Sequence, residues 1–377
     1  MEAIHITSAE QLRQVAFAWD DLWWRSATTM PTVRAELIVQ WLEQFAPNTR
    51  FHAVVVQHNG QYIAALPLVA RKQRKVLRTG ALPNDPWSPS GDLLVDVDCN
   101  LDRVLDVMVT AFRQLPWKML WFDTALPETT RWQALADALQ RATMPFAARE
   151  RYRVARLPCD DNYESSRKKY SKNLRKSINK ATRRLEEQGA LRLRVETPNV
   201  ADAEQLLRRG FAVEDKSWKA KAGTSILCSP GMPEFYVRQA ELLAERGELV
   251  LAFLEHNGQP IAYEYAWNAK GVYHSFKVGY DEQFAWASPG QLLQHKLLEQ
   301  CHTDSEVHSM DCLGPIGQAV QQFRPESYGI GRMVIAIRGL LSRATLFAYQ
   351  HVWPKVARRR NATQPDGSLA AKTTSVR

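Results

Sequence analysis

The 377-residue chain lacks the features that mark secreted, disulfide-linked and membrane-spanning proteins. Its five cysteines are scattered and include no CxxC spacing, which argues against a disulfide framework and against a zinc site. The N-terminus lacks the basic-then-apolar order of a secretory signal, and no apolar run approaches the roughly 20 residues needed to cross a bilayer. From these absences we expect a metal-free protein of the cytoplasm.

Basic residues outnumber acidic ones, and the formal net charge is +9. Much of the excess lies in residues 167–184 and 355–360. Phosphate groups of a cofactor, of RNA or of lipid headgroups would all be attracted to such segments, so charge alone selects no partner. The length and a hydrophobic content of 45% suffice for two domains, each with its own core.

A strand-turn-strand pattern occurs twice in the chain. The copies are VVVQHNGQYIA at 54–64 and AFLEHNGQPIA at 252–262. Each joins two apolar segments by Asn-Gly, a pair that accepts positive φ at both turn positions and strongly signals a β-hairpin. Asn-Gly hairpins are common, but similar residues follow each copy at nearly the same offset, WSPSGDLL at 87–94 and WASPGQLL at 286–293. A duplicated domain explains both similarities.

Segments of helical and strand periodicity follow one another around each hairpin. This order is that of a mixed α/β protein. We therefore expect an α/β fold in which each half forms a mixed sheet flanked by helices.

The second copy leads into a candidate anion-binding element. A strand ends near Gly279, and Pro289 and Gly290 then open a helix. Proline in the first turn, after Ser288 as the N-cap, leaves free N–H groups and the positive end of the helix dipole open to a pyrophosphate. An ordinary capped helix is the alternative interpretation.

The first copy differs from the second at this point. It has Asp92 where the second has Gln291, and a carboxylate there disfavours an anion. We therefore expect the N-terminal copy to be a scaffold or an acceptor-side wall.

Four short motifs of the C-terminal half resemble the acetyltransferase domain of bacterial polysaccharide-biosynthesis proteins of the CelD type. They are GYD at 279–281, SPGQLL at 288–293, MDCLG at 310–314 and FR at 323–324. This family is itself similar to the FemAB peptidoglycan transferases. The resemblance covers roughly 162–338, and it implies a GNAT fold in which an acyl thioester meets an acceptor nucleophile.

The resemblance and the repeat together imply tandem GNAT-like domains. The expected divisions are 1–160 for a degenerate N-terminal domain, 161–190 for a basic linking helix, 191–345 for the acyltransferase domain and 346–377 for a basic, disordered tail.

The implied co-substrate is acetyl-CoA or another acyl-CoA, and no metal is implied. The residues expected to contact the acyl-CoA are Val278, Gly279, Ser288, Pro289, Gly290, Gln291 and Leu292. Trp218 and Arg324 are expected to contact the acceptor. Many relatives have lysine where this chain has Arg324, so the cation is retained but cannot act as a base.

Direct acyl transfer requires a group that removes the acceptor's proton and a donor for the leaving thiolate. The candidates are Asp311, His274, Glu264 and Tyr280. Each has a structural alternative: a carboxylate that caps a turn, a histidine satisfied within its strand, or a turn tyrosine. Cys312 is interpreted as structural because the neighbouring carboxylate disfavours its thiolate.

Residues 168–188 predict one amphipathic helix that Gly189 terminates. The apolar positions are Tyr170, Leu174, Ile178, Ala181 and Leu185, and the basic ones are Lys169, Lys172, Arg175, Lys176, Lys180, Arg183 and Arg184. The basic face is either simply solvated or binds the phosphates of a lipid-linked sugar, an aminoacyl-tRNA or an anionic membrane surface.

The resemblance therefore implies an acyl-CoA-dependent N- or O-acyltransferase that acts on a sugar or a cell-envelope polysaccharide precursor, either small or lipid-linked. Its expected location is the cytoplasm, at the inner face of the membrane if the basic helix binds there. A FemAB-like aminoacyl-tRNA-dependent transferase and a non-catalytic GNAT-fold binding module are the alternatives. No DNA partner is expected, and the aromatic and basic platform of a single-strand binder is absent.

Overall fold

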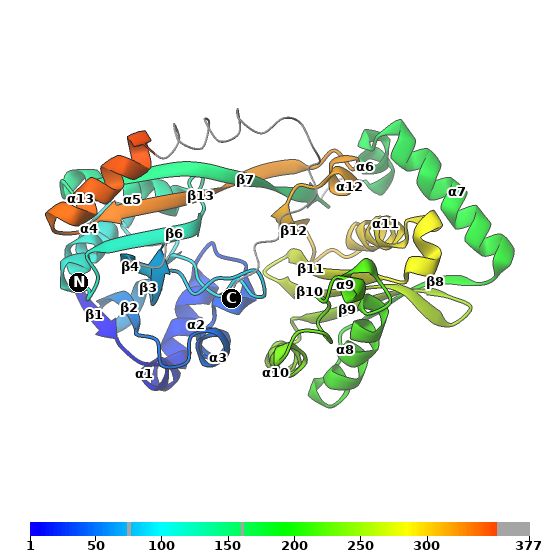
Figure 1. The fold of residues 1–377 in the computed structure, drawn as a ribbon, viewed down its shortest axis with the longest axis horizontal. Coiled ribbons are helices and arrows are strands. Elements are labelled where there is room, and N and C mark those ends of the chain that lie inside the picture. The colour runs from blue at the N-terminus through cyan, green and yellow to red at the C-terminus, as the bar shows by residue number, and fades with distance from the viewer. Residues whose placement is uncertain (74–76, 160–161, 353–377) are drawn as a thin grey trace.

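A computed structural model describes residues 1–73, 77–159 and 162–352 of the chain. Its central feature is one continuous mixed sheet of 13 strands with helices on both faces (Figure 1). The expected α/β class, a mixed sheet flanked by helices, is confirmed. None of the helices in these residues is long and apolar enough to span a bilayer.

The N-terminal half begins at a sheet edge and alternates strands with helices. Its elements are β1 (Glu2–Ile6), α1 (Ala9–Gln14), α2 (Ala16–Arg25), α3 (Ala35–Phe45), β2 (Phe51–His58), β3 (Gln61–Gln73), β4 (Leu77–Ala81), β5 (Leu94–Val95), α4 (Leu101–Ala111), β6 (Met119–Ala125), α5 (Thr130–Arg141) and β7 (Phe146–Pro158).

The C-terminal half repeats this plan with longer helices. Its elements are α6 (Tyr163–Lys169), α7 (Lys172–Gln188), β8 (Leu191–Glu196), α8 (Val200–Glu214), α9 (Trp218–Lys221), α10 (Met232–Ala244), β9 (Leu249–His256), β10 (Gln259–Ala269), β11 (Val272–Tyr280), α11 (Pro289–Cys301), β12 (Ser309–Pro315), α12 (Gln318–Gln321), β13 (Glu326–Ala336) and α13 (Leu340–Phe347).

Both predicted hairpins are present. Asn59 and Gly60 join β2 to β3 with φ values of 51° and 81°, and Asn257 and Gly258 join β9 to β10 with values of 52° and 77°. Positive φ at both central positions gives a turn whose twist matches that of the flanking strands. The local sequence therefore determines these two turns.

The two halves exchange their last strands. The sheet order is β1-β2-β3-β4-β6-β13-β7-β12-β11-β10-β9-β8, so β13 pairs with β6 of the first half and β7 pairs with β12 of the second. The exchanged strands also pair antiparallel with each other, and Figure 1 shows them side by side in the upper part of the view, running from the first half toward the second. The expected division at 160 thus separates β7 from the two strands with which it pairs, β12 and β13, because strand periodicity does not say which strands pair with each other.

Apolar side chains cover both faces of the sheet in each half. In the first half, α4 and α5 pack on one face and α1, α2 and α3 on the other. In the second half, α7 and α11 cover one face and α8 and α10 the other. The large fully buried side chains include Trp19, Trp132, Phe211 and Trp267. This layered packing fixes the position of the loops between the halves.

The predicted basic helix is two helices rather than one. Helix α6 ends at Lys169, and Ser171 caps α7 by accepting a hydrogen bond from the backbone N–H of Leu174 at 3.0 Å. A serine cap starts a new helix because its side chain satisfies an otherwise free donor. The apolar face of α7 is buried as predicted, and the helix ends before Gly189.

The expected tail from 346 onward is ordered in its first seven residues, which complete α13 and continue as a helical turn (Ala348–Val352). Leu346 and Tyr349 are buried against Met119 and Trp121 of β6. The strand exchange creates this surface, which the sequence pattern does not reveal. The rest of the expected tail, residues 353–377, lies outside the described residues.

Candidate functional site

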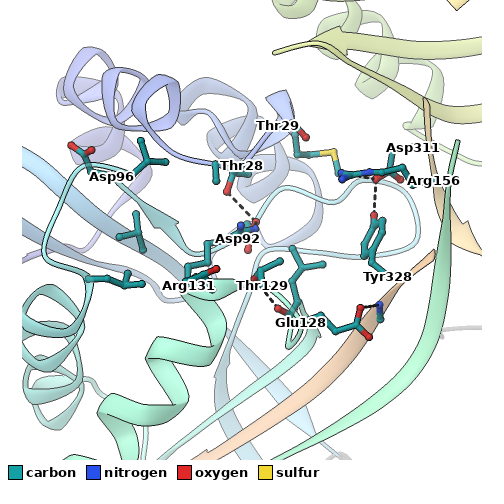
Figure 2. Close-up of a pocket in the computed structure, with 18 of the residues that line it drawn as sticks. Thr28, Thr29, Asp92, Asp96, Glu128, Thr129, Arg131, Arg156, Asp311 and Tyr328 are labelled. Atoms are coloured by element: carbon teal, nitrogen blue, oxygen red, sulfur yellow. Dashed lines mark hydrogen bonds and ion pairs between the residues drawn. The ribbon is translucent and has the colours of Figure 1, made fainter. Parts of the chain in front are cut away.

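A cavity of about 580 Å³ lies between the two halves (Figure 2). The loop after α2, the segment from 92 to 101 and the turn before α5 form its N-terminal wall, and β7, β11, β12 and β13 form the opposite side. Its polar side chains include Thr28, Thr29, Asp92, Asp96, Glu128, Thr129, Thr130, Arg131, Arg156, His274, Asp311 and Tyr328. We call this the interface cavity.

Two of the four predicted proton-handling residues line the interface cavity. His274 of β11 and Asp311 of β12 are register partners in a parallel pair, so they lie side by side on one face of the sheet. Both are almost fully buried. The two residues are 37 positions apart in the sequence, and no sequence pattern predicts that they are neighbours. The pairing of β11 with β12 brings them together.

The contacts of His274 define its tautomer. Its Nε2 lies 3.3 Å from the carbonyl oxygen of Thr29, which can only accept, so Nε2 carries the hydrogen. Its Nδ1 is buried and has no hydrogen-bond partner among the described residues. Burial lowers the pKa of His274, and the nearby charge of Asp311 opposes this shift. The imidazole is therefore neutral near pH 7, with a free lone pair on Nδ1.

Asp311 is held rigidly beside this histidine. Its Oδ2 accepts a hydrogen bond from the Tyr328 hydroxyl at 2.8 Å, and its Oδ1 accepts one from the backbone N–H of Leu313 at 2.9 Å. Figure 2 shows Tyr328 and Arg156 next to this carboxylate, and Arg156 Nη2 lies 3.9 Å from Oδ2. Asp311 thus caps the turn at Leu313 and also lines the cavity, so both roles considered for it occur together.

Sequence reasoning missed Arg156 and Tyr328. They come from the exchanged strands β7 and β13, where they face each other in a cation–π contact of 5.6 Å. Burial and the charge of Asp311 raise the pKa of Tyr328, so its hydroxyl remains a donor. Only the strand exchange places these side chains in the cavity, and no local sequence pattern predicts that exchange.

The opposite wall contains a second anchored carboxylate. Asp92 accepts hydrogen bonds from Arg131 Nη2 at 2.7 Å, from Thr28 Oγ1 at 3.2 Å and from Trp132 Nε1 at 3.1 Å. Figure 2 shows Asp92 and Arg131 at the cavity wall. The residue that distinguished the first repeat from the second is therefore engaged in fixing this wall.

Lys270 ties the two halves together next to the cavity. Its ammonium group donates hydrogen bonds to the carbonyl oxygens of Ser26 at 2.8 Å, of Thr28 at 2.9 Å and of Trp23. Burial lowers the pKa of Lys270 to about 8. These contacts hold the loop after α2 in place, and that loop supplies the carbonyl of Thr29 to His274.

Glu264 does not reach the interface cavity. It lies on β10 between Tyr263 and Tyr265, whose rings pack on the α8 and α10 side, so Glu264 faces the α11 side. His274 pairs directly with Trp267 on the α8 and α10 side, so the two candidates lie on opposite faces of the sheet. Burial raises the pKa of Glu264 to about 7.

A Glu264→Gln variant is therefore expected to keep its activity and to gain stability at high pH. The folded-state pKa is raised from 4.5 to about 7, so the stability of the buried neutral form is present below pH 4.5 and is lost as pH rises through 7. The loss amounts to about 3 kcal/mol. Chemical denaturation should give similar stabilities for both proteins at pH 4.5 and a more stable variant at pH 8. If a folded variant lost transfer activity, Glu264 would instead have a role in the transfer reaction.

The predicted anion-binding element starts α11, but Ser288 does not cap it. Ser288 has φ of 47° and ψ of 55°, and its side chain makes no capping hydrogen bond. Its backbone carbonyl accepts from Leu292 N at 3.1 Å, and the first turn is left without a side-chain acceptor. The expected serine cap is thus wrong, while the free N–H groups that an anion would use are present.

The other residues expected to contact the acyl-CoA lie at or near the start of α11. Val278 and Tyr280 lie next to Gly290, where an added Cβ would be 3.7 Å and 3.8 Å from their nearest atoms. Pro289, the first residue of the helix, and Leu292 are both buried. The side-chain amide of Gln291 donates to the carbonyl of Ala319 at 3.1 Å.

Gly279 has a structural reason to be glycine. A Cβ at this position would lie 2.7 Å from Cα of Glu214 in α8 and 2.9 Å from the Tyr263 ring. The close backbone approach expected from a strand-end glycine is therefore made to α8, and the expected role in holding a cofactor is not needed to explain it.

Strands β11 and β12 connect the cavity to this helix end. They pair at only three positions, the last of which is His274 with Asp311, although both strands continue beyond it. A register shift against β10 leaves Phe276 as the extra residue of a bulge in β11. From His274 to Tyr280 an extended strand covers roughly 20 Å. The diverging strands thus lead from the interface cavity to the start of α11.

The two residues expected to contact the acceptor do not line the interface cavity. Trp218 starts α9 and is 54% exposed. Arg324 lines a separate cavity of about 110 Å³ beside Tyr170 and Phe323. The two expected acceptor contacts therefore lie outside the interface cavity and remain predictions. In the described part of the chain, no group of three or more His, Cys, Asp and Glu side chains could hold a metal ion.

Residues 172–320 match the family of acetyltransferase (GNAT) domains. The fold is similar to the crystal structure of FemX, with a TM-score of 0.59, 9% identity, and 89% of this chain and 97% of that chain covered. It is also similar to the C-terminal domain of a putative lysylphosphatidylglycerol synthetase from Agrobacterium fabrum, with a TM-score of 0.52, 12% identity, and 90% and 96% covered. A tandem GNAT protein from the clavulanic acid biosynthesis pathway aligns with a TM-score of 0.47, 12% identity, and 90% and 100% covered. No curated protein matches the sequence.

The likeness to FemX extends over both halves, so it applies to the joined architecture and not to the second half alone. At this identity it shows the fold, and the family match over 172–320 shows the class of enzyme. Residues 172–320 match an acetyltransferase (GNAT) domain, so the chain is an acyltransferase by that domain, and its fold across both halves is similar to that of FemX.

Proposed function

We propose that the protein transfers an acyl group from a CoA thioester to an amine or hydroxyl group of a sugar or cell-envelope polysaccharide precursor held in the interface cavity. The observation that carries the proposal is the neutral, unpartnered Nδ1 of His274 beside the anchored carboxylate of Asp311. A volume of about 580 Å³ lies within the range of small-molecule sites. The threonine-rich wall supplies hydroxyl groups suited to a sugar.

In the proposed reaction His274 acts as the general base. Its Nδ1 accepts the proton of the attacking N–H or O–H as the bond from the acceptor to the acyl carbon forms and the bond from that carbon to sulfur breaks. The carboxylate of Asp311 stabilises the imidazolium that results, because an opposite charge nearby favours the charged form. The imidazolium then returns this proton, directly or through water, to the departing thiolate, which leaves as the free thiol, and no covalent intermediate with the protein is required.

The proposed donor site is the open end of α11. Gly290 and Gln291 would present backbone N–H groups to the pyrophosphate of CoA, with Val278 and Tyr280 beside them. The bound donor supplies the thioester carbonyl and the leaving thiol. The roughly 20 Å along β11 to His274 suits a ligand that is extended between the two sites. This places the donor on one half and the acceptor between the halves.

The experiment that tests the donor is thermal unfolding with acetyl-CoA, CoA and a longer acyl-CoA. A ligand at a hundred times its dissociation constant adds about 2.7 kcal/mol to the stability of the folded state. Stabilisation by acyl-CoA, together with thiol release on addition of an amino sugar such as glucosamine, supports the proposal. The absence of a shift with every acyl-CoA would refute the proposed donor.

An aminoacyl-tRNA donor is the second candidate, and the surface of α7 favours it. Lys172, Lys176, Lys180 and Arg184 are exposed and form no ion pair with any of the described residues. In this case tRNA would bind with strong salt dependence, and charge reversal on α7 would abolish binding. Salt-sensitive tRNA binding without an acyl-CoA shift would favour this donor over the first. Both candidates fit a protein of the cytoplasm.

A further inference from the structure

A second cavity, of about 800 Å³, lies in the N-terminal half, away from the interface cavity. The ends of β3, β4 and β6 and the start of α13 surround it. Its charged side chains are all cationic: Arg50, Arg71, Lys72, Arg78 and Lys118. Among the residues that the structure describes, no carboxylate lines it. We call this the basic cavity.

Four of these cations have no counter-charge within the described residues. Arg50, Lys72, Arg78 and Lys118 are exposed, and their side chains form neither an ion pair nor a hydrogen bond in the described part of the chain. Arg71 differs, because it donates to the carbonyl oxygen of Asn84. Cations gathered around one hollow repel each other unless an external anion neutralises them. The basic cavity therefore has the charge pattern of a site for several phosphates.

An apolar ridge adjoins the basic cavity. Leu341 of α13 lines the cavity and is 72% exposed, and Leu340 before it is 87% exposed. Phe347, two helical turns beyond Leu340 on the same side of the helix, is 60% exposed. The opposite side of α13 packs on the sheet through Leu346, so the exposed apolar side chains face outward.

The sequence around α13 contains no acidic residue between Glu326 and Asp366. Arg343 is exposed on the helix between the leucines and Phe347. An amphipathic helix that presents apolar side chains next to cations is the pattern that binds at the surface of an anionic bilayer. A nucleic acid would use the cations but not the large apolar side chains.

We propose that the basic cavity and the outward side of α13 form a docking surface for an anionic phospholipid bilayer. Lys72, Arg78 and their neighbours bind headgroup phosphates, while Leu340, Leu341 and Phe347 enter the boundary between headgroups and acyl chains. This surface differs from the membrane contact expected from the sequence, which is the basic face of α7. It does not depend on the donor or the acceptor of the transfer reaction.

The test measures sedimentation of the full chain with vesicles of phosphatidylcholine alone and of phosphatidylcholine mixed with phosphatidylglycerol. We expect binding only to the mixed vesicles, and weaker binding at high salt. Lys72→Glu/Arg78→Glu should reduce the affinity at least about 30-fold, since each cation near an anionic surface contributes about a fivefold change. Leu340→Ser/Leu341→Ser should also weaken binding, which a purely electrostatic contact would not show.

The matched control is Lys176→Glu/Lys180→Glu on α7, which changes the charge by the same amount at exposed positions. It should leave vesicle binding unchanged. Because all the altered side chains are exposed, the thermal unfolding of each variant should match that of the parent. The proposal would be overturned if the protein bound both kinds of vesicle equally, or if only the α7 variant lost binding. It would also be overturned if tRNA displaced the vesicles to the same extent from the parent and from Leu340→Ser/Leu341→Ser.

Discussion

Replacing His274 by glutamine is expected to slow acyl transfer by about 10²- to 10⁴-fold, the range typical of removing a general base. Glutamine keeps an N–H for the carbonyl of Thr29 but lacks a basic lone pair, so the loop contact survives and the proton acceptor does not. The measurement is the single-turnover release of thiol from acetyl-CoA with glucosamine as the acceptor. Single turnovers separate the chemical step from binding.

The control for this variant is His308→Gln, since the side chain of His308 is exposed and lies outside the interface cavity. It should retain the full rate. A folded His274→Gln protein with an unchanged rate would exclude His274 as the base and leave Asp311 as the remaining candidate in the cavity.

The pH profile gives a readout that a merely structural role would not change. Burial holds the pKa of His274 below its ordinary value of 6.5, and the base acts only when unprotonated, so the rate should rise with pH around a midpoint below 6.5. The carboxylate of Asp311 raises this pKa, so Asp311→Asn should move the midpoint to still lower pH and reduce the plateau rate. A midpoint that stays in place would contradict the proposed coupling of the two residues.

Gly290→Glu is expected to weaken acyl-CoA binding by about 100-fold or more while the fold is retained. Like charges a few ångströms apart near a protein surface repel each other by about 4 kcal/mol, and the new carboxylate would lie at the open helix end where the pyrophosphate is proposed. The fold should tolerate the side chain, because a Cβ at this position has only ordinary contacts with Val278 and Tyr280. Thermal unfolding with and without acetyl-CoA measures the loss.

The matched control is Gly290→Ala, which adds the same Cβ without the charge and should keep most of the affinity. The equivalent glycine of the first repeat, Gly91, is unsuitable as a control because a Cβ there would lie 2.4 Å from Cδ of Pro83. If Gly290→Glu retained its affinity for acyl-CoA, the donor site could not lie at the start of α11. That result would not affect the role of the interface cavity, which rests on His274 and Asp311.

Local sequence patterns predicted the parts of the site that depend on neighbouring residues. Asn-Gly turns bring their flanking strands together because both central residues accept positive φ, and Pro289 starts a helix because its fixed φ suits the first turn. The asymmetry between Asp92 and Gln291 also proved informative. In the folded chain Asp92 anchors the wall of the interface cavity, while Gln291 lies at the open helix end.

The same patterns could not separate Glu264 from His274. Both lie in strands of alternating or apolar character, and both are buried. Whether a buried strand residue faces a packed helix or a cavity depends on what covers that face of the sheet. Helix α11 covers Glu264, whereas the loop after α2 comes from the other half of the chain and leaves a cavity beside His274.

By itself the sequence determined that this chain is a duplicated mixed α/β protein with two hairpins and an open helix start in the second copy, since these features arise from contacts between residues close in the chain. Only the tertiary structure decided that β7 and β13 change places between the halves. That exchange depends on ladders between residues far apart in sequence, such as Ser327 with Ala155 and Met333 with Phe122. Strand periodicity specifies which face of a strand is buried but not which strand lies beside it. The exchange brings Arg156 and Tyr328 to Asp311, and it thereby completes a site that neither half contains alone.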